Sequence, residues 1–467
     1  MEISLNTAQT MDRRRFLAGL GASGSTLLLP HAGAQASRRE KPNIIFIMAD
    51  DVSAKEYSIH GGKGTQTPVL DKMAREGVAF TTAWAVPQCM PTRALLHTGN
   101  YACNTGWYGN AVQGADFSER DSIMGKMMQR CSYKTAWYEK FHFLGRQPDP
   151  RPFGFDEYAV AMPWQGHNGP PQDRRESMYQ IQWFWHPGIV RNGTGIPTRP
   201  ADFGPDLHAD MIIDFMKRHR DEPFFVYWPT FLPHMDFNDK RWSYTDVPEL
   251  DAAGSKTGRK IRGSLKSTLE YLDHLVGRVL DGLGKLGLAE ETIVIFAGDN
   301  GTAPYGKNRF EDERGPHVPF VVWGPGRVKS RGMSDVLVDF SDVMPTLVDL
   351  AGGDIPARAR VDGHSFAPYL LGQPFEERET IFCQFYDGRW VRDKRYLLDA
   401  RGVVWDCGKE RNESSKAYKK LTQESDPQRL SEVMNRFRGV LERYPAPDTS
   451  RPEWRRYRKR HRPALLP

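Results

Sequence analysis

Two continuous apolar runs, each leading into acidic or amide side chains, constrain the fold of this chain more than any other feature. The first run spans residues 43–49 and ends in Asp50-Asp51; the second spans residues 292–297 and leads through a glycine into Asp299-Asn300. Such runs predict strands buried on both faces, as in a parallel sheet covered by helices. Open α/β sheets place ligands beyond the carboxyl ends of their strands, so the two polar pairs predict a site there. Either pair alone would more often be a turn or a helix cap.

A cysteine lies between the two runs in the sequence, in the segment Cys89-Met90-Pro91-Thr92-Arg93. Residues 94–98 predict a short helix that stops at Gly99, and Pro91 suits the first helical turn, where its missing N–H costs nothing. Cys89 is therefore expected at a helix N-terminus, where free N–H groups and the helix dipole favour an anion. The plain alternative is a small buried hydrophobe.

This segment resembles the sulfatase motif Cys-x-Pro-x-Arg, in which the cysteine is oxidised to formylglycine, an aldehyde whose hydrate supplies a hydroxyl nucleophile; Thr92 replaces the commoner serine. Three further segments are similar to motifs of that family. Residues 133–145 resemble its Lys-x-His segment, with Glu139 in place of a glycine, and this segment is expected on a strand, where Lys140 and His142 would point to the same face. Residues 232–234 resemble its Pro-His. Residues 313–320 resemble Glu-Gly-Gly-x-Arg-Val-Pro, with His317 in place of the arginine.

The chain thus resembles a bacterial arylsulfatase-like or glycan sulfatase of the alkaline phosphatase superfamily. The resemblance implies an α/β fold, with a large mixed, mainly parallel sheet sandwiched between helices and a smaller C-terminal α+β subdomain. It also implies one metal ion bound by Asp50, Asp51, Cys89 (as formylglycine), Asp299 and Asn300. Oxygen donors without a Cys/His cluster favour calcium or magnesium over zinc or copper. The family argues for calcium, and magnesium stays an alternative.

The catalytic residues implied by the resemblance are Cys89, Arg93, Lys140, His142, His234 and Lys307. A hydroxyl of hydrated formylglycine, deprotonated with help from Asp299, would attack the sulfur of a sulfate ester. Lys140, His234 and Lys307 would neutralise the sulfate oxygens, and His234 or the lysine would protonate the leaving oxygen. His142 would take the proton of the second hydroxyl so that sulfate leaves, and Arg93 would hold the diol. Lys307 is one residue out of register with the family's lysine, which leaves Arg309 as an alternative cation.

The N-terminal segment indicates export. Arg13-Arg14 with Phe16-Leu17 precedes an apolar stretch and the Ala-x-Ala signal of residues 34–36, a pattern typical of a twin-arginine signal peptide of a bacterium. No later stretch approaches the ~18 apolar residues of a membrane span. We therefore expect a periplasmic or secreted protein, not an integral membrane protein. Its expected partners are the Tat machinery, a formylglycine-generating enzyme or anaerobic maturase, and a sulfated small molecule or polysaccharide.

Four parts are predicted along the chain: a signal peptide (1–36), a sulfatase catalytic domain (37–375), a C-terminal subdomain with a small antiparallel sheet and a helix (376–450), and a basic tail (451–467). The tail carries seven Lys or Arg against one Glu, so its own charge equals the whole net charge of +6. The remaining chain is near neutral, which argues against nucleic-acid binding. Short strands are expected over 379–385 and 389–398, and a helix near 427–444.

Two features leave alternatives open. Residues 160–205 are rich in Pro, Gly and Trp, and Trp164, Trp183 and Trp185 suit either a sugar platform or ordinary packing. The number of cysteines does not require disulfides in so large a chain, and their spacing shows no metal-ligand pattern, so a bridge between Cys383 and Cys407 is possible but undetermined.

Two other functions compete with sulfate ester hydrolysis. One is phosphate or phosphonate ester hydrolysis on the same scaffold, against which the absence of an extra arginine cluster beside the motifs argues. The other is a non-catalytic glycan binder with an unmodified Cys89.

Overall fold

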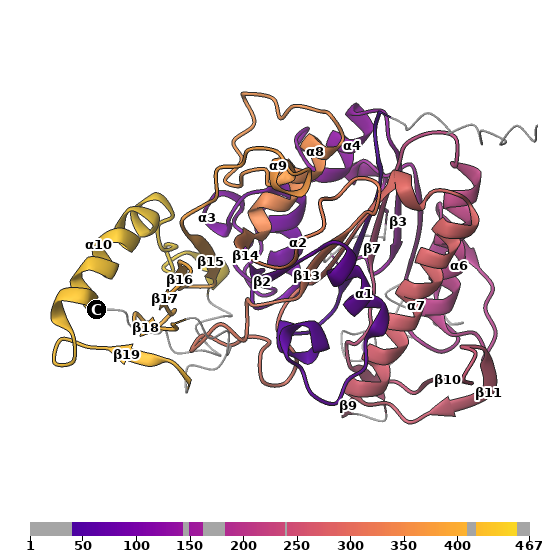
Figure 1. Cartoon of the computed structure of the whole chain (residues 1–467), viewed down its shortest axis with the longest axis horizontal. Helices are drawn as coiled ribbons and strands as arrows, with labels where there is room; N and C mark the ends of the chain where they lie inside the picture. The colour runs from indigo at the N-terminus through magenta and orange to yellow at the C-terminus, as the bar shows by residue number, and fades with distance from the viewer. Residues whose placement is uncertain (1–39, 143–148, 162–182, 239–240, 409–416, 455–467) are drawn as a thin grey trace, which may run out of the picture. The chain divides into compact units, whose positions relative to one another are not determined.

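The structure, a computed structural model, describes residues 40–142, 149–161, 183–238, 241–408 and 417–454. Its main element is a 10-stranded sheet in the order β14-β2-β13-β12-β1-β7-β3-β4-β5-β6 (Figure 1). In chain order the strands are β1 Asn43–Ala49, β2 Val78–Trp84, β3 Lys134–Glu139, β4 Glu157–Ala161, β5 Ile189–Arg191, β6 Thr194–Ile196, β7 Phe224–Pro229, β12 Thr292–Gly298, β13 Phe320–Trp323 and β14 Gly332–Asp339. The central strands β12, β1, β7, β3 and β4 are parallel to one another.

The two apolar runs form neighbouring strands at the centre of this sheet. β1 pairs with β12 in parallel from Asn43 opposite Thr292 to Ala49 opposite Gly298. This register brings Asp50 and Asp299, the next residues of each strand, to the same edge of the sheet. Both strands are buried along their whole length, as expected for a sheet covered on both faces.

Helices cover both faces of the sheet (Figure 1). Among the described residues, the helices of the large domain are α1 Pro68–Glu76, α2 Cys89–Thr98, α3 Ala102–Thr105, α4 Met124–Arg130, α6 Gly204–Arg218, α7 Leu265–Lys285, α8 Val343–Leu350 and α9 Ala367–Leu370. Alternate residues of β1 point to opposite faces: Phe46 packs in the core beneath α2, α4 and α8, whereas Ile47 packs in the core beneath α1, α6 and α7. The predicted sandwich of a mainly parallel sheet is thereby confirmed.

A second, 5-stranded antiparallel sheet follows the large one. It contains β15 Ile381–Phe385, β16 Gly388–Arg392, β17 Tyr396–Leu398, β18 Val404–Asp406 and β19 Lys419–Leu421, and helix α10 Pro427–Arg443 packs beside it. The smaller α+β subdomain is therefore confirmed. The strand expected over 389–398 is two strands, β16 and β17, because the chain turns at residues 393–395. The boundaries of the predicted domains stay predictions.

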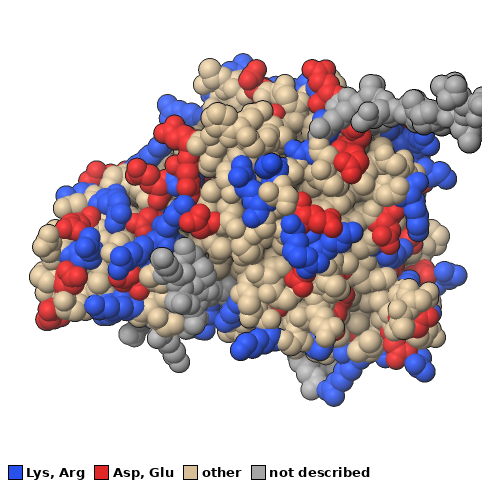
Figure 2. Space-filling view, viewed as in Figure 1, with Lys and Arg blue, Asp and Glu red and all other residues tan. Residues whose placement is uncertain are grey.

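Two short hairpins complete the described strands: β8 Asp236–Asn238 with β9 Arg241–Ser243, and β10 Val247–Leu250 with β11 Lys256–Ile261. None of the five cysteines forms a disulfide, so the open question of a bridge between Cys383 and Cys407 is answered: the structure contains none. No helix among the described residues is long and apolar enough to cross a membrane. Basic and acidic side chains are interspersed over the face shown in Figure 2. The predicted signal peptide and nearly all of the basic tail lie outside the described residues.

Candidate active site

The polar pairs that end β1 and β12 meet as the sequence predicts. The Asp51 N–H donates to Asp299 Oδ1 over 3.0 Å, and Asn300 Nδ2 donates to Asp51 Oδ1 over 2.8 Å. Asp51 has a φ of 61°, a left-handed conformation that is uncommon outside glycine. All four residues, Asp50 included, are buried. Buried carboxylates need compensating charge, so the site must contain cations.

Three cationic side chains provide that compensation. Arg93 Nη2 lies 2.8 Å from Asp299 Oδ2, Lys140 Nζ forms an ion pair with Asp50 Oδ2, and Lys307 Nζ lies 2.7 Å from Asp51 Oδ2. Burial would raise the pKa of Asp50, but Lys140 and the other nearby cations hold it below its ordinary range. Burial raises the pKa of Asp299 to about 7, and the Asp50 charge acts in the same direction. Three carboxylates and three cations leave the cluster close to neutral.

Two oxygens of this cluster have no hydrogen-bond donor. Asp50 Oδ1 and Asn300 Oδ1 are both buried and accept no hydrogen bond. The side chains of Asp50, Cys89 and Asp299 also bring one ligand atom each to within 4.8 Å of one another. A second group of this kind contains Asp50, Asp51 and His234. Orphaned carboxylate and amide oxygens are the donors that a hard cation would satisfy, so these residues fit a calcium or magnesium ion.

Cys89 is the first residue of α2, as its sequence context predicts. The helix ends at Gly99, which has a φ of 65°, a conformation that glycine adopts without steric cost. Burial raises the pKa of the Cys89 thiol. An unmodified Cys89 is therefore mostly protonated at neutral pH, which makes it a weak nucleophile.

The structure brings Lys307, rather than Arg309, to the cluster. The Lys307 side chain is mostly buried, whereas Arg309 lies 3.4 Å from Glu311 in a half-exposed ion pair. Between them Asn308 adopts a φ of 64° and donates its N–H to the Pro87 carbonyl. This left-handed residue turns the chain directly after Lys307, although the lysine is one residue out of the family's register.

Both predicted catalytic histidines lie near the same charges. His234 Nε2 is 3.4 Å from both Asp51 Oδ2 and Lys307 Nζ, and its Nδ1–H donates to the Met235 carbonyl over 2.5 Å. Burial lowers the pKa of His234 to about 4. Burial lowers the pKa of His142 well below its ordinary value, and the Lys140 charge acts in the same direction. Both imidazoles are therefore neutral at pH 7.

Several details differ from the sequence-based expectation. Lys140 and His142 were expected on a strand, but β3 ends at Glu139, so both follow the strand. The chain turns because Glu139 has a φ of 79°. His317, which replaces the family's arginine, does not join the cluster, because its Nε2–H donates to the Thr81 carbonyl. Lys140 and His142 still reach the site because the turn redirects the backbone.

Two tryptophans flank His234. Trp183 lies edge-on to it at a ring distance of 5.4 Å and stacks on Phe231, and Trp242 lies on it at 5.8 Å. Trp242 is 46% exposed, unusually high for a tryptophan. Trp183 is one of the tryptophans for which the sequence suggests a sugar platform or ordinary packing, whereas nothing in the local pattern around Trp242 marks a site. Trp185 instead packs under Lys260, and Trp164 lies outside the described residues.

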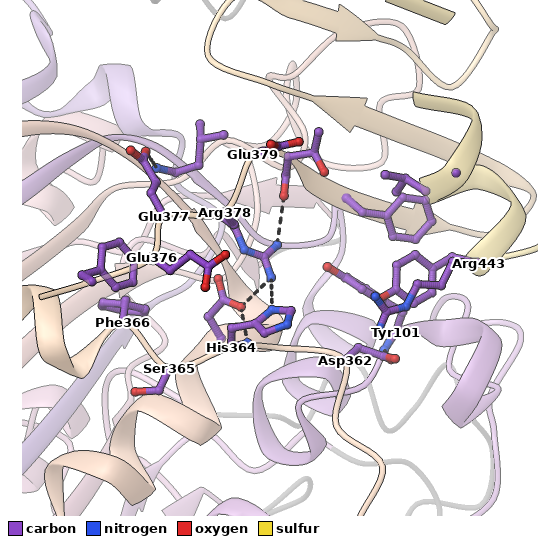
Figure 3. Close-up of a pocket in the computed structure, with 18 of the residues that line it drawn as sticks. Tyr101, Asp362, His364, Ser365, Phe366, Glu376, Glu377, Arg378, Glu379 and Arg443 are labelled. Carbon is purple, nitrogen blue, oxygen red and sulfur yellow. Dashed lines mark hydrogen bonds and ion pairs between the residues drawn. The ribbon is translucent and has the colours of Figure 1, made fainter. Parts of the chain in front are cut away.

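A separate cavity of about 680 Å³ lies between α10 and residues 362–382 (Figure 3). Arg378 at its floor binds Asp342 and Asp339, and Asp362, His364 and Arg443 also line it. None of the predicted site residues lines this cavity. The candidate active site is therefore the cluster at the ends of β1 and β12.

The sequence also matches known protein families. The family model Sulfatase matches residues 42–353, and the model N-sulphoglucosamine sulphohydrolase, C-terminal, matches residues 302–435. N-acetylgalactosamine-6-sulfatase of Canis lupus familiaris is 26% identical over 402 residues, which cover 78% of this chain and 70% of that protein. An ulvan-active sulfatase of Formosa agariphila is 27% identical over 377 residues, covering 76% of this chain and 65% of that protein.

The fold is shared with a solved structure as well. Ps i-CgsB in complex with k-i-k-neocarrahexaose matches with a TM-score of 0.66 at 21% identity, over 91% of this chain and 98% of that chain. The first family model covers well over half of the chain. The resemblance inferred from the motifs is thereby confirmed: the chain belongs to the sulfatase family and is a sulfuric ester hydrolase.

Proposed function

We propose that this sulfatase hydrolyses a sulfate monoester of a carbohydrate, with formylglycine at position 89 and one bound calcium ion. The observation that carries the proposal is the meeting of Cys89, the carboxylates of Asp50 and Asp299, and the cations Arg93 and Lys140 in one buried cluster. A near-neutral cluster that also binds a divalent cation gains positive charge, which suits an anionic substrate.

Asp50, Asp51, Asp299 and Asn300 would bind the metal together with residue 89. The support is chemical, because Asp50 Oδ1 and Asn300 Oδ1 are buried without a donor. A bound calcium or magnesium ion would polarise a sulfate oxygen and lower the pKa of a coordinated hydroxyl. The preference for calcium comes from the family resemblance, and magnesium is the alternative.

The modification of Cys89 is favoured by the environment of its thiol. Burial keeps the thiol protonated, whereas the hydrate of formylglycine would supply a hydroxyl nucleophile and a second hydroxyl through which sulfate can leave. The Asp299 carboxylate lies within 4.8 Å of the Cys89 side chain and is suited to accept a proton there. Arg93 keeps Asp299 in place through its 2.8 Å contact and would hold the diol.

Lys140 and Lys307 would contact the sulfate oxygens, and His234 would orient Lys307, whose Nζ lies 3.4 Å from His234 Nε2. Because the Nδ1–H of neutral His234 is used by the Met235 carbonyl, its Nε2 is an acceptor. Lys307 is therefore the better donor to the leaving oxygen, and the Asp51 charge keeps it protonated by raising its pKa despite burial. Neutral His142 is suited to remove the proton of the second hydroxyl.

A carbohydrate is favoured as the alcohol by the surroundings of His234. Trp242 presents a partly exposed indole 5.8 Å from the His234 ring, and Trp183 contacts the same ring edge-on at 5.4 Å. Tryptophan faces combine an apolar surface with a polar edge, which suits sugar rings. The ulvan-active relative and the structure with bound neocarrahexaose are named for glycans.

Phosphate or phosphonate ester hydrolysis is the second candidate. A phosphoryl dianion needs more neutralisation than a sulfate monoanion, yet Arg309 is engaged by Glu311 rather than by the cluster. Matched sulfate and phosphate esters of one alcohol distinguish the two, and faster turnover of the phosphate would reject the sulfatase assignment. A non-catalytic binder predicts that Cys89→Ala leaves glycan binding unchanged and that no ester is turned over.

The proposal also includes Tat export to the periplasm or medium and modification by a formylglycine-generating enzyme or anaerobic maturase. The test is the mass of the tryptic peptide of residues 76–93, taken from protein purified from its native host. The aldehyde mass at position 89 is expected. An unmodified thiol in active protein would overturn the formylglycine mechanism.

A further inference from the structure

Glu139 occupies a position where the family's motif carries glycine, and its backbone shows why glycine suits it. The residue has a φ of 79°, in the left-handed region that costs a residue with a side chain roughly 1 kcal/mol or more. It is also fully buried. Retaining a buried glutamate in a strained conformation requires compensation by specific interactions.

The carboxylate of Glu139 makes three hydrogen bonds to one short segment of the chain. Oε2 accepts from Trp228 Nε1 at 2.8 Å. Oε1 accepts from Thr230 Oγ1 at 3.0 Å and from the Phe231 N–H at 2.7 Å. Both oxygens are therefore occupied, so Glu139 is not available to the reacting atoms.

The segment held by Glu139 carries the other side of the candidate site. The His234 N–H donates to the Phe231 carbonyl at 2.6 Å, and the Asp50 N–H donates to the Leu232 carbonyl at 3.0 Å. On the opposite side, Lys140 follows Glu139 directly, and its N–H donates to the Pro229 carbonyl. One carboxylate thus links the backbone of Lys140 to the turn that presents His234.

We propose that Glu139 is a positioning residue that fixes Lys140 relative to His234 and to Lys307, whose Nζ lies 3.4 Å from His234 Nε2, so that both lysines contact the same sulfate group. The inference rests on the proposed function, in which the two lysines bind sulfate oxygens. The glycine of the family's motif adopts this backbone conformation without strain. In this chain the strain at Glu139 is instead compensated by its three hydrogen bonds to Trp228, Thr230 and Phe231, which we call the Glu139 clamp.

The first test is Glu139→Gly in the calcium-loaded, formylglycine-bearing full chain. Glycine relieves the positive φ, so the fold should be retained while the clamp is lost. We expect kcat/KM for a sulfate ester to fall about 10- to 100-fold, since a displacement near 1 Å costs about that much, mostly through kcat. Binding of inorganic sulfate, measured by calorimetry, should weaken in parallel.

Ser132→Gly is the matched control for the backbone. Ser132 also has a positive φ, of 64°, but lies exposed before β3. It should leave kcat/KM and sulfate binding unchanged. If Glu139→Gly behaves like Ser132→Gly in both measurements, the positioning role is wrong.

A second pair of variants tests the hydrogen bonds themselves. In Glu139→Gln the new amide N–H faces either the Trp228 Nε1–H or the Phe231 N–H, so two donors oppose each other. Adding Trp228→Phe removes one of these donors and should restore several-fold of the activity that Glu139→Gln loses, although Trp228→Phe alone lowers it. Additive losses in the double variant would contradict the clamp. If formylglycine-bearing wild type turns over no sulfate ester, the proposed function fails, and the sulfate affinities still test Glu139.

Discussion

Lys307→Met is the sharpest test of the candidate site, because the sequence left two cations as candidates for one role. Lys307 Nζ lies 2.7 Å from Asp51 Oδ2 and 3.4 Å from His234 Nε2, and its side chain is 17% exposed. Arg309 is 35% exposed and pairs with Glu311. The two residues are two positions apart, so a comparison of their variants separates site chemistry from general surface charge.

The expected size of the effect follows from burial. Removing one charged donor from a largely water-excluded catalytic site costs about 3–4 kcal/mol, which is about 10²–10³-fold in kcat. Removing a half-exposed ion pair costs about 0–1 kcal/mol, so Arg309→Met should stay within a few-fold of the wild type. Lys307→Met also frees Asp51 Oδ2 of its cationic partner, so calcium should bind no more weakly than in the wild type.

The assay is steady-state hydrolysis of a sulfate ester by wild type, Lys307→Met and Arg309→Met, each checked for formylglycine content. Calcium affinity is measured by calorimetry on the same samples. Loss of activity in Arg309→Met with retention in Lys307→Met would refute the assignment. Loss of activity together with loss of calcium binding in Lys307→Met would show a metal-site defect instead of a missing proton donor.

Three further predictions concern other parts of the molecule. Removing calcium with a chelator should lower Tm, because at a concentration of 100 Kd the bound ion contributes about 2.7 kcal/mol to the free energy of unfolding. Asp299→Ala should abolish this shift in Tm. An unchanged Tm in the wild type would contradict the metal site. Trp242→Ala should raise KM for a sulfated oligosaccharide about 5- to 10-fold, through the loss of about 1 kcal/mol of ring contact, whereas Ile261→Ala, which also removes an exposed apolar side chain, should not. Burial raises the pKa of Asp342 to about 7 despite the nearby Arg378, so its contribution to stability is full below about pH 4 and is lost, by about 2–4 kcal/mol, as the pH rises to about 7. The free energy of unfolding, measured with urea at pH 5 and at pH 7.5, should differ less between the two pH values in Asp342→Asn than in the wild type. An equal difference in the two proteins would reject the raised pKa.

The sequence was sufficient for the sheet and for much of the site because those features are local. An apolar run ending in Asp50-Asp51 predicts both a buried strand and the edge of the sheet at which the polar pair lies, and the same holds for Asp299-Asn300. Cys89 at the first position of α2 follows equally from Pro91 and Gly99. Such patterns need no knowledge of the tertiary structure.

Other features depend on contacts between distant segments, which no local pattern encodes. Trp242 belongs to a short hairpin strand and lies at the site only because the chain folds back onto His234. The end of β3 at Glu139 was missed because glutamate is not a turn residue, and the three donors that stabilise it are about 90 positions away. The choice of Lys307 over Arg309 likewise depends on the turn at Asn308.

Backbone strain links these unpredicted details to the function. Asp51, Glu139 and Asn308 all adopt positive φ without being glycine, and each adjoins a residue whose side chain enters the cluster or is itself part of it. Strained conformations persist only where surrounding contacts hold them in place. Here hydrogen bonds do so: they join Asp51 to Asp299, Glu139 to the segment 228–231, and Asn308 to Pro87. Each strained residue therefore turns the chain at the point where Asp50, Lys140 or Lys307 must face the centre. Relaxing one of them should disturb catalysis more than stability, because the relief of strain offsets the lost hydrogen bonds in the free energy of unfolding but not in the geometry of the site.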